Sequence, residues 1–164
     1  MATMGLGEDV EGVKNRRNEH GEFVPTAVLS PKFAVHIHGR FRITCGDRIV
    51  LAKNDMFEPS SKIENEPGFD WDAWESDEND GWDAVGNNRY DELCSRYFAD
   101  EPLEFVVKKA TVSRWGDLKV VFENGFVLET FVDNTGDIEC WVFFEDGGKG
   151  IFIEITGQGL TAEE

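Results

Sequence analysis

The sequence predicts a mainly β protein of the α+β class, an antiparallel, hairpin-built bent sheet or open barrel with one short helix. Three observations favour this fold. Apolar residues alternate with polar ones in most segments after residue 33, turn residues separate these segments, and long uninterrupted apolar runs typical of a parallel sheet are absent. We count seven to nine such segments.

The first expected strands lie between residues 33 and 52. Apolar Phe33, Val35 and Ile37 alternate with smaller or polar residues, which indicates a strand with one buried face. Residues 41–45 and 49–52 then flank the turn residues Gly46-Asp47, so this region predicts a hairpin.

The last third of the chain repeats this arrangement. Asn124-Gly125 separates two alternating segments and is a strong hairpin signal, because both residues tolerate positive φ. A helix is expected over residues 89–99, where the apolar side chains fall on one side and Pro102 follows. The expected strands here are residues 103–112, 118–122, 126–132, 138–144 and 150–156.

The domain organisation follows from length and pattern. Residues 1–25 are polar and weakly patterned, so we expect a polar tail or a loosely anchored segment there. Residues 26–164 are expected to form a single β-rich domain, since 164 residues with thirteen Phe supply an ample core. An acidic, Trp-rich insertion at residues 58–88 has no period and is long for a connection, which indicates either a functional or a disordered loop.

Negative charge is concentrated in one part of the chain. Residues 1–62 carry nine Lys/Arg and eight Asp/Glu, whereas residues 63–164 carry seven and twenty-five, so the latter hold the formal net charge of −17. Such a field repels nucleic acid and anionic membranes and attracts basic partners. We therefore expect a basic protein partner, with no nucleic acid and no membrane.

The compartment is inferred from segments that the sequence lacks. No stretch approaches the ~20 apolar residues of a membrane span, and the first residues do not have the pattern of a signal peptide. The three cysteines, Cys45, Cys94 and Cys140, form no CxxC pair and are expected to be reduced thiols. These features predict a cytoplasmic protein.

Residues 64–83 are the densest acidic region, with nine acids, three Trp and no basic residue. In one interpretation the carboxylates meet Arg and Lys of a partner while the tryptophans act as buried anchors. In the other, the loop folds back, its tryptophans cover a sheet and its acids are merely solvated. The candidate partner-binding residues are Asp70, Trp71, Asp72, Trp74, Glu75, Asp77, Glu78, Asp80, Trp82 and Asp83.

We expect neither a metal site nor a cofactor. An EF-hand loop with Gly81 in sixth place would begin at Ser76 and end at Asn87, and neither residue fits the pattern. His36 and His38 fall on one face of the expected strand, a spacing that two metal ligands can use, but the sequence places no third ligand. Their other interpretation is a polar outer face.

The sequence carries no catalytic signature. It has no Gly-x-Ser-x-Gly motif, and the glycine-rich residues 147–150 join two β segments as a hairpin turn rather than a phosphate loop. A catalytic group assembled only in three dimensions leaves no trace in sequence, so the pattern favours a binding protein without deciding the question.

Residues 116–129 read GDLKVVFENGFVLE, and Phe131 and the ECWVFF of residues 139–144 follow. The pattern resembles one of small uncharacterised bacterial proteins, which are similar in size and acidity to immunity proteins that neutralise bacterial toxins. The resemblance implies no catalytic residue and does not extend to residues 58–88.

The leading hypothesis is a non-enzymatic acidic binding protein, of the type of an immunity inhibitor, that binds a basic protein partner. One alternative is a small-molecule-binding β-barrel, an enzyme among the options, with a cavity lined by Phe and Trp. A second alternative is a DNA mimic whose rows of acids copy the spacing of phosphates.

Overall fold

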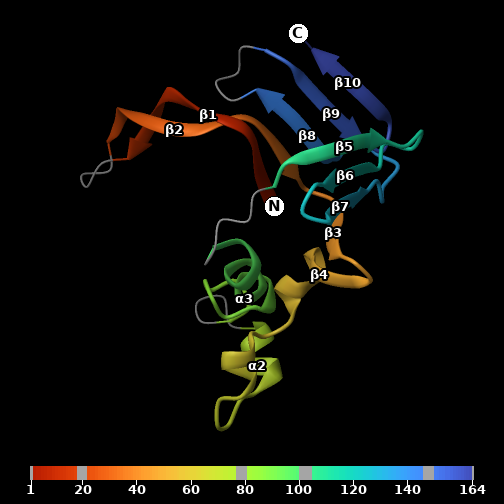
Figure 1. The fold of residues 1–164 in the computed structure, drawn as a ribbon. Helices are drawn as coiled ribbons and strands as arrows, with labels where there is room; N and C mark the ends of the chain where they lie inside the picture. Colours follow the sequence, from red (N-terminus) through yellow and green to blue (C-terminus); the bar gives the residue numbers. More distant parts are fainter. Residues whose placement is uncertain (1, 18–21, 77–80, 100–104, 146–149, 164) are drawn as a thin grey trace. The chain divides into compact units, whose positions relative to one another are not determined.

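The computed structural model describes residues 2–17, 22–76, 81–99, 105–145 and 150–163. They form a mainly β protein with two antiparallel five-stranded sheets and a few short helices, and neither sheet is closed into a barrel (Figure 1). The predicted fold class is thus confirmed. The chain divides into two compact units, Met1–Gly39 with Phe131–Glu164, and Arg40–Thr130. Each of the two sheets buries its own set of apolar side chains.

Sheet 1 lies in the first unit, in the spatial order β1-β2-β8-β9-β10. Its middle strand β8 buries Cys140, Trp141 and Val142 in succession, so side chains on both faces of the strand are buried there. The strands are β1 (Ala2–Arg17), β2 (Phe23–Ile37), β8 (Glu139–Glu145), β9 (Phe152–Thr156) and β10 (Gly159–Glu163).

Strand β1 occupies most of the stretch expected as a polar tail. It pairs along its length with β2, whereas β8 pairs only with the last residues of β2, Phe33 to Ile37. The earlier part of the hairpin is therefore a two-stranded ribbon. Pairing with β2 satisfies the backbone groups of β1 without requiring an apolar face, which is why the sequence pattern gave no sign of it.

Sheet 2 lies in the second unit, in the order β4-β3-β7-β6-β5. Both predicted hairpins are present in it and turn at Gly46 and Gly125, whose φ values of +58° and +87° suit glycine. Phe122 and Leu128 are among its most deeply buried side chains. The strands are β3 (Arg40–Cys45), β4 (Arg48–Ala52), β5 (Val107–Val112), β6 (Leu118–Phe122) and β7 (Phe126–Phe131).

The helices of the second unit are short. The predicted helix is present as α3 (Arg89–Cys94), continued by the π-helical turn η2 (Ser95–Ala99). It packs on sheet 2, with the ring centroid of Tyr90 6.2 Å from that of Phe41 and the centroid of Phe98 6.3 Å from that of Phe126. Three further pieces were not expected, since one or two turns are too short to show a period: η1 (Lys53–Phe57), α1 (Ser61–Glu64) and α2 (Trp71–Ser76).

Candidate functional site: an acidic lobe

Residues 58–88, which we call the acidic lobe, are joined at their base. Pro59 and Asn88 form an antiparallel bridge, the Ser60 N–H donates to the Asn87 carbonyl at 2.8 Å, and the Arg89 N–H donates to the Glu58 carbonyl at 2.7 Å. The two ends of the lobe therefore leave and re-enter the second unit side by side, as in a large Ω-loop. Within its described residues the lobe is a folded substructure rather than an extended connection.

Asn88 links the base of the lobe to α3. Its side chain is buried, its Oδ1 accepts from the Asp91 N–H at 2.8 Å, and its Nδ2 donates to the Trp82 carbonyl at 2.8 Å. The first of these bonds is an N-cap, which satisfies a backbone donor at the start of the helix. One buried amide thus caps α3 and binds the backbone of the lobe at Trp82.

Two carboxylates of α3 tie down further backbone of the lobe. Glu92 accepts from the Ser61 N–H at 2.6 Å and from the Ser61 hydroxyl at 3.1 Å, and Asp91 accepts from the Gly86 N–H at 2.8 Å. The Ser61 N–H is the main reason that the pKa of Glu92 lies below its usual value of 4.5, against an opposing effect of burial. Arg96, 2.7 Å from Glu92, also lowers that pKa.

The three tryptophans of the lobe differ in exposure. Trp74 is 6% exposed, and its indole nitrogen has no hydrogen-bond partner among the described residues. Trp71 is 42% exposed, with its ring centroid 5.5 Å from that of Trp74. Trp82 is half-buried, 5.4 Å from the ring of Phe57. Of the candidate anchors, Trp71 offers the largest free face and Trp74 serves the packing of α2.

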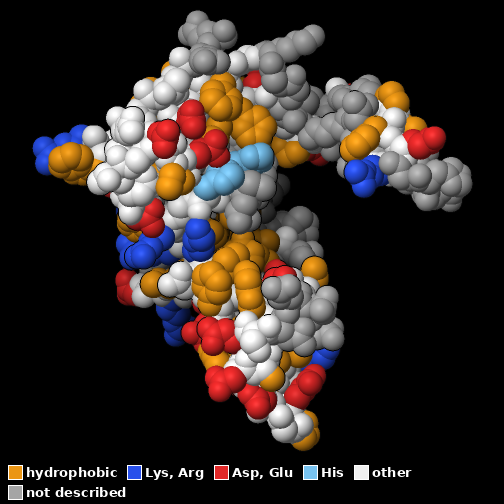
Figure 2. Space-filling view, turned by 180° about the vertical axis from the view of Figure 1, so that it is seen from behind, with side chains coloured by type: hydrophobic (Ala, Val, Ile, Leu, Met, Phe, Trp, Pro, Cys, Tyr) orange, Lys and Arg blue, Asp and Glu red, His pale blue; other side chains and the backbone are white. Residues whose placement is uncertain are grey.

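The described acids of the lobe face solvent. Asp70 accepts from the Ala73 N–H at 3.1 Å and so caps α2, while Asp72, Glu75 and Asp83 are exposed and form no ion pair within the described part of the chain. Figure 2 shows carboxylates gathered at the lower end of the view, where Figure 1 places α2. The remaining candidates, Asp77, Glu78 and Asp80, lie outside the described residues.

Glu129 on β7 shows how carboxylates elsewhere in the second unit are neutralised. Its carboxylate forms ion pairs with Nη2 of Arg42 at 2.8 Å and with Nζ of Lys119 at 3.1 Å. Burial raises the pKa of Glu129, but the hydrogen bonds from Arg42 and Lys119 outweigh that effect and the pKa is lowered. Basic side chains therefore neutralise this acid of the sheet, whereas the described acids around α2 have no basic side chain paired with them.

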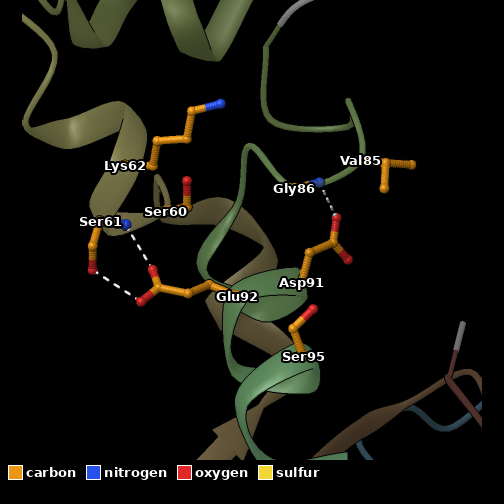
Figure 3. Close-up of a pocket in the computed structure, with 8 residues that line it drawn as sticks. All are labelled: Ser60, Ser61, Lys62, Val85, Gly86, Asp91, Glu92 and Ser95. Atoms are coloured by element: carbon orange, nitrogen blue, oxygen red, sulfur yellow. Dashed lines mark hydrogen bonds between the residues drawn. The ribbon is translucent and has the colours of Figure 1, made fainter. Parts of the chain in front are cut away.

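A shallow depression of about 380 Å³ lies beside the base of the lobe (Figure 3). Ser60, Ser61 and Ser95 line it, together with Asp91 and Glu92. Both carboxylates are engaged with backbone N–H groups, and the described lining contains neither His nor Cys. The described lining therefore shows no pairing of a Ser or Cys nucleophile with a histidine.

Cys94 on α3 is not an activated thiol. Burial is the largest cause that raises its pKa, and a hydrogen bond from Tyr90 opposes this only in part. A thiol of raised pKa stays protonated at neutral pH and is a poor nucleophile. Within the described residues, all three cysteines are free.

His36 in β2 and His38, which directly follows that strand, lie in the first unit. His36 packs edge-on against Phe144 at 4.6 Å, and Nε2 of His38 lies 2.6 Å from Oε1 of Glu139. They are the pale blue surface in Figure 2, since His20 lies outside the described residues. Nowhere in the described ranges do three His, Cys, Asp or Glu side chains gather in a way that could hold a metal ion.

Asn88 in the lobe and Glu92 on α3 are the residues of this site that sequence reasoning missed. An Asn immediately before an apolar helical pattern, with an acid three residues later, is a signal for a helix start that could have identified Asn88. The partner of Glu92, Ser61, lies 31 residues away, and no local pattern reveals that contact.

Comparisons with known proteins give no further guide: no family model matches the chain, and neither curated proteins nor solved structures match it significantly. Among the described residues, no helix combines the length and apolarity needed to cross a membrane.

Proposed function

We propose that this chain is a non-enzymatic acidic binding protein whose acidic lobe binds a basic protein partner, in the manner of an immunity-type inhibitor. One observation carries the proposal: Asp72, Glu75 and Asp83 are exposed without ion pairs in the described structure, close in sequence to the half-exposed Trp71. Carboxylates without internal cations keep their full attraction for external ones.

The electrostatic argument concerns rate and specificity more than affinity. An exposed ion pair is worth only about 0.2–1 kcal/mol, so no single acid of the lobe would hold a partner. Several acids of one sign instead steer a basic partner during encounter and reject acidic competitors. The net charge of −17 acts in the same direction over longer distances.

Trp71 would supply the short-range part of the interaction. Its exposed indole face can cover the guanidinium of an arginine or fill a small pocket, both common at the centres of interfaces. The ring of Trp74 packs against that of Trp71, with the two centroids 5.5 Å apart. This contact restricts the rotation of Trp71 and pre-orients it for a partner. In this proposal Trp74 does not contact the partner but positions Trp71, which does.

Charge reversal tests the proposal. The full-length protein is immobilised, host lysate is passed over it at low and then high salt, and bound proteins are identified by mass spectrometry. We expect the wild type to retain a basic protein at low salt and to release it at high salt. The variant Asp72→Lys/Glu75→Lys should lose that protein, and its association with the purified partner should slow by about tenfold or more. Asp70 is left intact because it caps α2.

The matched control reverses Asp133 and Asp137, two exposed acids of the turn between β7 and β8. It changes the net charge equally but should leave capture intact. If both variants lost capture of the partner equally, net charge alone would explain the effect. That result would contradict a role for the lobe. A captured nucleic-acid-binding protein that competes with DNA would favour DNA mimicry, and recovery of a bound small molecule alone would overturn the proposal.

A further inference from the structure

Strand β5 is an edge of sheet 2 with both faces open. It stands at the end of the order β4-β3-β7-β6-β5, and all six of its residues are exposed. Val107 and Val112 are 42% and 47% exposed, and Trp115, just beyond the strand, is 67% exposed. Exposed edge strands are templates for pairing with another chain, so a reason for leaving this one open is needed.

Backbone groups of β5 point away from the sheet. Thr111 faces Lys119 in the register with β6, and the Ser113 N–H donates to the Asp117 carbonyl at 2.8 Å. Hydrogen-bonded residues alternate along an antiparallel pair, so Ala110 and Val112, which lie between them, direct their N–H and C=O groups outward. No described residue pairs with these groups.

The charge around β5 is opposite to that of the rest of the chain. Residues 105–119 hold four basic residues and one acid, whereas the other residues hold twelve basic residues and thirty-two acids. Lys119 is engaged with Glu129, but no described carboxylate pairs with Lys108 or Lys109. Arg114 lies over the ring of Trp115 at 4.4 Å, which extends the basic and apolar surface past the end of the strand.

The lysines make the edge selective. The register shifts between Val107 and Lys109, and a bulge with lysines is a common device against pairing of edges. A strand that carries basic or neutral residues gains nothing from these lysines. An acidic strand gains cross-strand ion pairs at the same positions, and the exposed valines offer it apolar contacts.

We propose that β5 is the docking edge for an extended acidic segment of a partner protein. The segment adds to sheet 2 as a further strand, bonds to the outward groups of Ala110 and Val112, and places carboxylates beside Lys108 and Lys109. Recognition of this kind takes affinity from the main chain and specificity from alternate side chains. The proposal does not depend on the acidic lobe, and the two surfaces take partners of opposite charge.

A labelled peptide that alternates Glu and Val is the probe, with the full-length protein titrated into it and fluorescence anisotropy measured. We expect binding, with amide NMR shifts largest at Ala110 and Val112. The fully N-methylated peptide, which keeps the side chains but donates no backbone hydrogen bond, should not bind. The double variant Lys108→Glu/Lys109→Glu should weaken binding by about tenfold or more.

The matched control is Arg48→Glu/Lys62→Glu, which makes the same charge change at an exposed residue of β4, the other edge strand, and at one of α1. It should bind the peptide nearly as well as the wild type. Equal weakening in both variants, undiminished binding of the N-methylated peptide, or amide shifts confined to other strands would each overturn the proposal. So would absence of binding, or a dimer of the protein alone that the β5 variant dissociates, since a second copy would then be the occupant.

Discussion

The acidic lobe and sheet 2 belong to the same compact unit but are held together by different interactions. Among the residues whose burial the structure describes, nine of the sixteen buried apolar side chains lie in strands of sheet 2, and the described part of the lobe contributes only Trp74. The lobe is held instead by polar side chains that bond to its backbone, chiefly from Asn88, Asp91 and Glu92. A region with few buried apolar contacts opens at a smaller free-energy cost than a packed sheet.

This contrast separates scaffold from recognition surface. The sheet can tolerate loss of the lobe's polar bonds, because its apolar core does not include them. The lobe can be loosened or tightened by one amide or one carboxylate at its base, which would change how well Trp71 and the exposed acids are pre-organised for a partner. Three variants test this, in decreasing order of effect.

Phe122→Ala should have the largest effect, because the ring is almost fully buried in sheet 2 and contacts Phe105 with centroids 5.2 Å apart. Removing a buried Phe side chain costs about 3–5 kcal/mol of unfolding free energy. Urea unfolding followed by far-UV circular dichroism measures the loss. The lobe variant Val85→Ala is the control, since Val85 is 95% exposed and should change stability by less than about 0.5 kcal/mol. Similar losses in the two variants would contradict the comparison.

Asn88→Ala should act on the lobe and on the first turn of α3, and leave sheet 2 unchanged. It removes the cap of α3 and the bond to the Trp82 carbonyl, with an expected cost of about 1–2 kcal/mol. Hydrogen exchange measured by mass spectrometry should become faster in peptides of the lobe and stay unchanged in those of sheet 2. Asn88→Ser, which keeps a capping oxygen, should give a smaller change. Faster exchange throughout the sheet would show that the two regions open together.

The sequence identified the parts of the fold whose information is local. The Asn124-Gly125 turn, the alternation of β6 and β7 and the apolar side of residues 89–99 each depend on neighbours in sequence, and each is present in the structure. Strand β1 was not recognised because it is rich in glycine and acids and pairs with β2 only. The exposed end strand β10 was missed as well.

The acidic lobe could be recognised as unusual but not resolved into its parts. Composition marked residues 58–88, yet it could not show that Trp74 is buried and Trp71 half-exposed, because burial depends on the packing of the folded lobe. The bridge between Pro59 and Asn88 and the bond from Ser61 to Glu92 join residues about thirty positions apart. Contacts of this range leave no periodic signal.

Glu92→Gln should give the smallest effect, visible as a pH dependence. The folded-state pKa of Glu92 is lowered, mainly by the Ser61 N–H, so its ionised form stabilises the lobe. That contribution is fully present above the unfolded-state value near 4.5 and is lost as pH falls through the lower folded-state pKa. Protection of lobe amides in the wild type should therefore exceed that in the variant at neutral pH, and the difference should vanish in acid.

Glu129→Gln is the matched control for that pH dependence. Its carboxylate also has a lowered pKa, but its partners Arg42 and Lys119 lie on sheet 2. At neutral pH the variant should show weaker protection of the amides of sheet 2 than the wild type, and this difference should also vanish in acid. Protection of the lobe amides should be unchanged. If both variants altered the same amides, the lobe and the sheet would be one cooperative element, and the polar bonds at the base of the lobe would not tune it independently.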